Sequence, residues 1–166
     1  MKRATAFLHI IYSLAVLLLI LDSLNGFDIK SQMLKCFSYF SVLIGTPAVL
    51  AWNLFSKTQS KRKPGWIFFT AVILVVVALT GPMKFFFTSG AWCTQTVMYE
   101  HGHFSFKTIE FQMQDLGALG YKSRTVEVLY LTPLFIIIND FPCNVEPQTE
   151  WIKVDKDINE LGLKYP

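Results

Sequence analysis

The chain begins with three long apolar runs that are separated by short polar stretches. The runs occupy residues 5–24, 34–55 and 65–83. Each approaches or exceeds the length of roughly 20 residues that crosses a bilayer as an α-helix. Pro47 falls in the middle of the second run, where its missing backbone donor predicts a kink. The pattern therefore predicts three transmembrane helices within residues 1–87.

Beyond residue 87 the pattern changes to short segments in which apolar and polar residues alternate. Such segments, with turn residues between them, are typical of antiparallel strands. A change of face predicts a β-bulge near Lys107 or Thr108, and residues 155–163 are compatible with a short helix. Residues 88–166 are thus expected to form a small antiparallel β domain, so the fold class is membrane α+β. The expected strands are 94–99, 104–113, 124–130, 134–138 and 149–154.

Composition and charge agree with this division. Apolar residues (AVILMFWYC) make up 52% of the chain and charged residues 16%, whereas a soluble domain has about 25% charged residues. Residues 1–87 carry nine Lys and Arg against two Asp and Glu, and the remainder carries six against ten. The sequence lacks the clustered basic surface of a nucleic-acid-binding protein, and no nucleic-acid partner is expected.

A basic hinge between the second and third runs sets the predicted orientation. Such loops stay on the cytoplasmic side of a membrane, and the basic residues Lys2 and Arg3 place the N-terminus on the same side. The first run lacks a small-residue cleavage site, so it is interpreted as an uncleaved helix and not as a signal peptide. With three crossings, the β domain is expected outside the cytoplasm. The basic residues of the hinge are Lys57, Lys61, Arg62 and Lys63.

Two of the three cysteines, Cys93 and Cys143, fall in the β domain. An oxidising compartment would favour a disulfide between them, and closing a loop of about 50 residues would contribute roughly 4 kcal/mol. Cys36, near the outer end of the second run, could compete for Cys93. Its alternative interpretation is a small buried apolar residue, and this alternative is favoured.

Histidines form the only metal-like cluster in the sequence. His101 and His103, beside Glu100, have the spacing of two ligands on one face of a strand, which would suit zinc or copper. No third ligand is evident nearby, and the stretch has the composition of a hairpin turn. A solvated turn is therefore favoured over a metal site.

A polar stripe runs along the first predicted helix, formed by Thr5, His9 and Ser13 with Tyr12 beside them. An ionisable residue within a membrane suggests a proton or ion pathway. Polar side chains also form contacts between helices. Asp22 and Asp28 lie at or beyond the outer edge of the predicted spans, so no carboxylate completes a relay and the contact is favoured.

The second predicted helix carries small residues at spacings of three, four and three. Small side chains allow close approach of helices, either within this chain or with a partner. The residues of this seam are Ser38, Ser41, Gly45 and Ala48.

Common catalytic motifs are missing from the sequence, including Gly-x-Ser-x-Gly, His-Glu-x-x-His, phosphate loops and Gly-x-Gly-x-x-Gly. The favoured hypothesis is a non-catalytic accessory or structural subunit of a larger membrane complex, without a cofactor, whose partners are lipid and other proteins. Topology and length favour a bacterial inner membrane with the β domain in the periplasm. The alternatives are a stand-alone sensor or immunity-type protein that binds through its acidic β domain, and an ion- or proton-handling subunit of a transporter or membrane enzyme.

Overall fold

The structure is a computed structural model, which describes residues 2–24, 26–56, 63–88, 90–141 and 150–163. The chain divides into two compact units. The helical unit comprises Met1–Ile20 and Met33–Ser89, and the sheet unit comprises Leu21–Gln32 and Gly90–Pro166.

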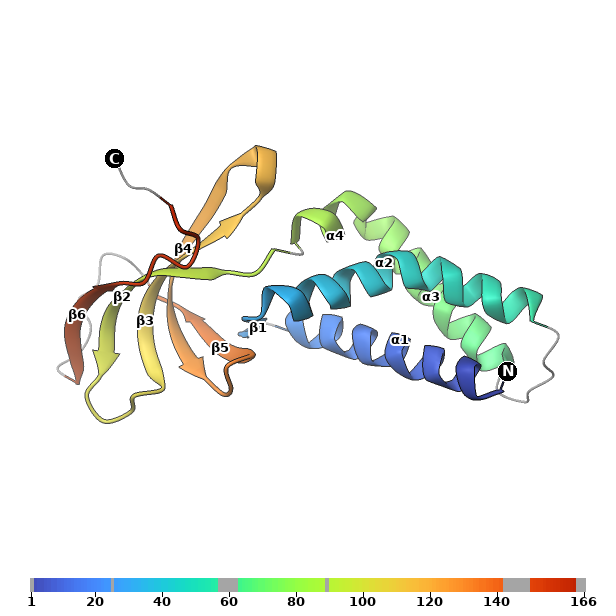
Figure 1. Ribbon diagram of the computed structural model, residues 1–166, viewed down its shortest axis with the longest axis horizontal. Helices are drawn as coiled ribbons and strands as arrows, with labels where there is room; N and C mark the ends of the chain where they lie inside the picture. Colours follow the sequence, from blue (N-terminus) through green and yellow to red (C-terminus); the bar gives the residue numbers. More distant parts are fainter. Residues whose placement is uncertain (1, 25, 57–62, 89, 142–149, 164–166) are drawn as a thin grey trace. The chain divides into compact units, whose positions relative to one another are not determined.

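Three helices of the helical unit are long and apolar enough to cross a membrane, as the sequence predicts. They are α1 (Lys2–Asp22), α2 (Gln32–Phe55) and α3 (Lys63–Thr80), and they run side by side (Figure 1). Their bounds differ from the predicted runs by two or three residues at most ends, because apolarity ends gradually where a helix reaches polar surroundings. The core between the helices contains Tyr12, Ala15, Val16, Val42, Val49 and Val77.

The third helix ends earlier than the sequence predicts. Gly81 has a φ of 87°, and its N–H donates to the carbonyl of Val77 at 3.1 Å. Glycine adopts this left-handed conformation without steric cost, and it commonly stands just past the last residue of a helix. A separate short helix, α4 (Pro82–Thr88), follows at once. Its first residue is proline, which fits there because the first N–H of a helix needs no partner.

The sheet unit contains one six-stranded antiparallel sheet with the order β1-β5-β4-β3-β2-β6 (Figure 1). Four strands that follow one another in the sequence, from β2 to β5, form its centre. The strands are β1 (Phe27–Ile29), β2 (Cys93–His101), β3 (Lys107–Asp115), β4 (Tyr121–Tyr130), β5 (Phe135–Asp140) and β6 (Trp151–Asp157). A 3₁₀ turn (Gly117–Leu119) joins β3 to β4.

One edge of the sheet comes from the connection between the first two helices. The sequence suggests only a loop there, but β1 pairs with β5, with Asp28 opposite Ile136. Ile29 is fully buried, and the ring of Phe27 lies 5.6 Å from that of Phe135. This connection therefore groups with the sheet.

The bulge expected near Lys107 or Thr108 is not present. Strand β3 pairs with β4 without interruption from Lys107 opposite Leu129 to Asp115 opposite Tyr121. The change of face in the sequence instead marks the beginning of β3. The register shifts occur in β2, between Thr94 and Thr96 and between Val97 and Tyr99.

The short helix expected over residues 155–163 is also not present. Strand β6 continues to Asp157, and the residues after it form a turn. The side chain of Asn159 organises this turn, because its amide donates to the carbonyl of Leu163 and its oxygen accepts from the N–H of Leu163, both at 2.8 Å. These side-chain bonds compete with helical bonds, which is the usual reason why asparagine favours turns.

Candidate functional site

Strand β3 carries polar residues at every second position. Because successive side chains of a strand point to opposite faces of the sheet, Thr108, Glu110, Gln112 and Gln114 share one face. All four are buried, and Glu110 is only 1% exposed. On the neighbouring strand, Val126 lies directly opposite Glu110. A buried carboxylate thus stands in the middle of the sheet and needs compensation from hydrogen-bond donors.

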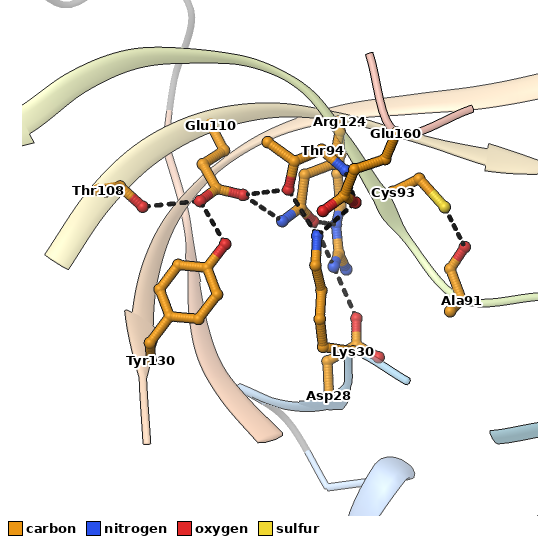
Figure 2. A network of polar contacts seen from close by, with 11 residues as sticks. Asp28, Lys30, Ala91, Cys93, Thr94, Thr108, Glu110, Arg124, Tyr130 and Glu160 are labelled. Carbon is orange, nitrogen blue, oxygen red and sulfur yellow. Dashed lines mark hydrogen bonds and ion pairs between the residues drawn. The ribbon is translucent and has the colours of Figure 1, made fainter. Parts of the chain in front are cut away.

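Four donors surround the carboxylate of Glu110 (Figure 2). Oε1 accepts from the hydroxyls of Thr108 at 2.8 Å and Tyr130 at 2.7 Å. Oε2 accepts from the hydroxyl of Thr94 at 2.7 Å and the amide of Gln112 at 2.9 Å. An ionised carboxylate has about four acceptor positions, so this side chain is saturated.

The surroundings keep this carboxylate ionised. Burial alone would raise the pKa of Glu110, but the hydrogen bonds from Thr94, Tyr130, Gln112 and Thr108 outweigh it and lower the pKa below its ordinary value of 4.5. Burial and the charge of Glu110 together raise the pKa of Tyr130. The tyrosine therefore stays protonated and remains a donor to the carboxylate.

A second branch of the network joins Thr94 to Lys30, which stands 64 residues earlier in the sequence. Lys30 Nζ lies 2.6 Å from Thr94 Oγ1 and 2.7 Å from Glu160 Oε2. Glu160 Oε2 also accepts from the backbone N–H of Thr94 at 2.6 Å. The Thr94 hydroxyl accepts from Lys30 and donates to Glu110, so it links the ammonium to the buried carboxylate (Figure 2).

A third branch runs through Gln112 to an arginine. The oxygen of Gln112 accepts from Arg124 Nε at 3.0 Å and Nη2 at 2.8 Å. Nη2 also lies 2.6 Å from Asp28 Oδ2, and the guanidinium stands 4.1 Å from the ring centre of Trp92. Burial lowers the pKa of Arg124, and Asp28 opposes that effect. Arginine nevertheless remains charged in proteins.

Besides Tyr130, the polar network contains five side chains that carry a charge, two basic and three acidic, and each has a partner within the chain. They are Asp28, Lys30, Glu110, Arg124 and Glu160. A general base needs an acceptor position that a substrate can reach, and an acid needs a proton to give near neutral pH. Glu110 has neither, because its acceptor positions are filled and its pKa is lowered. The hydrogen bonds of Glu110 therefore join β3 to both of its neighbours, β2 and β4.

The predicted disulfide has only one member in the part of the chain that the structure describes. The Cys93 thiol is half-buried, and its Sγ lies 3.9 Å from the carbonyl oxygen of Ala91. Burial, with a smaller contribution from Glu160, raises the pKa of this thiol. Cys143 lies outside the described residues, so its pairing with Cys93 stays a prediction. Cys36 lies on α2, and no disulfide forms among the cysteines that are described.

The two histidines of the sheet unit have different surroundings. His101 ends β2 and is buried, with its Nε2 3.3 Å from Glu150 Oε2 and its ring packed on Trp151 and Phe104. Its Nδ1 accepts from the backbone N–H of His103, whose side chain is exposed. Among the described residues, no group of three or more His, Cys, Asp or Glu side chains could hold a metal ion.

The polar stripe of α1 meets polar residues of α2. His9 Nδ1 donates to the carbonyl of Thr5 at 2.6 Å, and Nε2 lies 3.0 Å from the amide nitrogen of Asn53 and 3.2 Å from its amide oxygen. The ring of Trp66 from α3 covers this pair, with 4.3 Å between ring centres. One helical turn further along α1, Tyr12 and Thr46 share a hydrogen bond of 2.8 Å.

The members of the small-residue seam of α2 differ in their burial. Ser38 is fully buried and donates to the carbonyl of Leu34, and Gly45 faces the Tyr12 ring, which a Cβ would approach to 3.4 Å. Ser41 is half-buried and Ala48 is exposed. Whether the seam contacts a partner stays a prediction.

The basic hinge falls mostly outside the described residues, which leaves out Lys57, Lys61 and Arg62. Lys63 is the first residue of α3, and its Nζ donates to the carbonyl of Ser56 at 2.6 Å. The hinge's role in orientation stays a prediction.

Sequence reasoning missed the Glu110 network and Asn53. The sequence signal for the Glu110 network was the run of four polar residues at alternate positions of β3, and the signal for Asn53 was an amide within an apolar span.

Comparison with models of protein families, with curated proteins and with solved structures finds no match to this chain.

Proposed function

We propose that this chain is a non-catalytic integral membrane protein that serves as an accessory or structural subunit of a larger membrane complex. Its three helices cross a bacterial inner membrane with the N-terminus in the cytoplasm, and its sheet unit lies in the periplasm. It contacts its partners through both units and carries no cofactor.

The observation that carries this proposal is the saturation of the Glu110 network. The carboxylate has four donors, Arg124 is paired with Asp28, and Lys30 is paired with Glu160. A site that acts on a substrate keeps polar groups available to that substrate. In this network the polar groups are bonded to one another and join strands. The sheet unit therefore offers a partner a fixed shape more readily than a reactive group.

The helical unit supplies a surface for such a partner. Pro47, Ala48 and Ala51 are exposed on α2, between the larger exposed side chains of Ile44 and Trp52. Small side chains at a lipid-facing position let another helix approach closely. Lipid gains little contact from a flat surface of small side chains, so we expect a neighbouring protein to pack on this stretch.

Native purification tests the proposal. The full chain, with a small C-terminal tag and its own promoter, is extracted in a mild detergent, and the co-purifying proteins are quantified. We expect a membrane protein in a fixed ratio to the tagged chain. Accessibility of the same tag to protease in spheroplasts reports the side of the membrane on which the sheet unit lies.

Two variants show whether α2 is the contact. Ala48→Ile replaces a small exposed side chain by a large one and should lower the amount of partner recovered with the chain several-fold. Val72→Ile makes a comparable change at an exposed position of α3 and should leave it unchanged. A chain that purifies alone, or only with copies of itself, would contradict the subunit role.

A further inference from the structure

Two neighbouring connections between strands expose large apolar side chains. Phe104 and Phe106 lie in the connection from β2 to β3, and both are 49% exposed. Leu131 and Leu134 lie in the turn from β4 to β5, and they are 51% and 46% exposed. The two segments emerge side by side, because the N–H of Tyr130 donates to the carbonyl of Phe106 at 2.9 Å. These four residues are called the apolar rim.

The polypeptide ties this rim to the beginning of a predicted membrane span. The backbone N–H of Lys30 donates to the carbonyl of Leu134 at 2.9 Å. Lys30 stands two positions before Gln32, the first residue of α2, and two residues extend over at most about 7 Å. The Leu134 carbonyl therefore stays within about 10 Å of the start of α2. This limit follows from chain length and holds for any orientation of the two units.

In a bilayer that α2 crosses, the start of this helix would lie at the boundary between lipid chains and headgroups. The helix has 24 residues, which corresponds to about 36 Å at 1.5 Å per residue, whereas the hydrocarbon core is about 30 Å thick. A span of this length places its ends in the headgroup layers. Leu24, which follows the end of α1 by two residues, is also exposed, at 54%.

The chemistry of the rim suits this boundary. Neither residues 104–106 nor residues 131–134 contain a charged side chain, so partial immersion removes no charge from water. Phenylalanine and leucine side chains enter the boundary between headgroups and acyl chains favourably. A soluble domain that stood clear of the membrane would leave these side chains in water.

We propose that the apolar rim rests in the headgroup layer of the bilayer that the helices span, with Leu131 and Leu134 immersed deepest. The occupant of this surface is lipid. The sheet unit is thus held against the membrane by the rim in addition to its covalent connections. The inference rests on insertion of the helices in a bilayer and is independent of the partner proposed above.

Photocrosslinking in lipid nanodiscs tests this contact. The full-length protein is reconstituted in phosphatidylethanolamine and phosphatidylglycerol, with benzoylphenylalanine replacing Leu131, Leu134, Phe106 or Phe104 in separate variants. Irradiation followed by mass spectrometry measures lipid adducts. We expect adducts at Leu131 and Leu134 several-fold above the control position, with smaller yields at Phe106 and Phe104 because β3 is further than β5 from β1 in the sheet.

Two positions serve as controls. Lys156 is exposed on β6, the sheet edge opposite β1, and should give little lipid adduct. Val75 is exposed in α3, 56% accessible, and should give a strong one. Unchanged amide exchange of the central strands verifies that each variant is folded.

The outcomes separate the possibilities. Yields at Leu131 and Leu134 no higher than at Lys156, with strong labelling at Val75, would overturn the lipid contact and leave the subunit proposal intact. A crosslink from the rim to another protein in native membranes would assign the rim to that protein and overturn the lipid contact. No lipid adduct at Val75 would remove bilayer insertion itself, and with it both proposals.

Discussion

The two units of this protein pair the polar groups at their centres in different ways. In the helical unit, polar side chains pair singly between α1 and α2, as His9 does with Asn53 and Tyr12 with Thr46, and the buried Lys35 lies near the beginning of α2. In the sheet unit, the charged group of Glu110 has four donors and is linked through Thr94 and Gln112 to two further ion pairs.

This difference reflects the surroundings of each unit. In the membrane-spanning arrangement proposed above, a charge in the middle of the bilayer would be expensive, and each polar contact between spans contributes little because the separated helices also find polar partners. In the sheet unit, charges are compensated by partners on the same strand, on neighbouring strands and in the segments that follow β1 and β6. Loss of one member there leaves several buried groups without a partner, which is costly. The sheet unit should therefore be sensitive to single substitutions at its polar core, and the helical unit should tolerate them.

The largest effect is expected for Glu110→Val. The substitution leaves the hydroxyls of Thr94, Thr108 and Tyr130 and the amide of Gln112 without their acceptor. Breaking a buried charged network of this kind costs about 3–5 kcal/mol. Native-state hydrogen exchange of the amides of β3 and β4, in the full-length protein, measures the free energy of opening of the sheet unit.

Glu127→Gln is the matched control for that substitution. Glu127 lies on β4 and pairs with Lys107 at 2.8 Å, and both side chains are partly exposed. An ion pair of this type contributes less than about 1 kcal/mol. Similar losses for Glu110→Val and Glu127→Gln would refute the view that the sheet unit depends on its saturated carboxylate.

A smaller effect is expected when Glu110 is protonated by acid. Its pKa is lowered in the folded protein, so the unfolded chain binds a proton more readily. The stabilisation is therefore fully present above pH 4.5, the ordinary pKa, and is lost as the pH falls below it through the folded value. The loss should be less than that of Glu110→Val, because the protonated acid still accepts some of the hydrogen bonds.

Hydrogen exchange between pH 6 and pH 3 measures this dependence, after correction for the intrinsic exchange rate. Other carboxylates titrate in the same range, so the difference between the wild-type protein and Glu110→Gln isolates the contribution of Glu110. Parallel pH profiles of the two proteins would show that this carboxylate does not carry the acid sensitivity.

The same contrast explains which parts of the fold the sequence predicts. Helices α1, α2 and α3 are specified locally, because a long apolar run in lipid satisfies its backbone hydrogen bonds within the run by forming a helix. Strands β2, β3, β4 and β6 also follow from local alternation, and β5 from a short apolar run. Strand β1 has only three residues, Phe27–Ile29, and becomes a strand because β5 is there to pair with it. No local pattern distinguishes such a segment from a loop.

The polar network is harder to predict than the strands, because its members come from distant parts of the chain. Arg124 and Asp28 are 96 residues apart, and Lys30 and Glu160 are 130 apart. The alternation along β3 indicates that Thr108, Glu110 and Gln112 share a face, but not that the face is buried. By contrast, the helical spacing of Thr5, His9 and Ser13 predicts the polar stripe on α1. Only the partner of His9, Asn53, could not be identified without the structure.

The smallest effect is expected for the pair of His9 and Asn53, which the Trp66 ring covers. A double-mutant cycle with His9→Leu and Asn53→Leu, read out as the stability of the helical unit in a bilayer by steric trapping, should give a coupling of about 0.6 kcal/mol and no more than about 1.7 kcal/mol. A cycle of His9→Leu with Ser38→Ala should give none, because Ser38 bonds the carbonyl of Leu34 in its own helix. A coupling near the cost of Glu110→Val would mean that His9 carries a charge compensated by its surroundings. The two units would then handle buried polar groups alike, and a proton-handling role for α1 would replace the structural one.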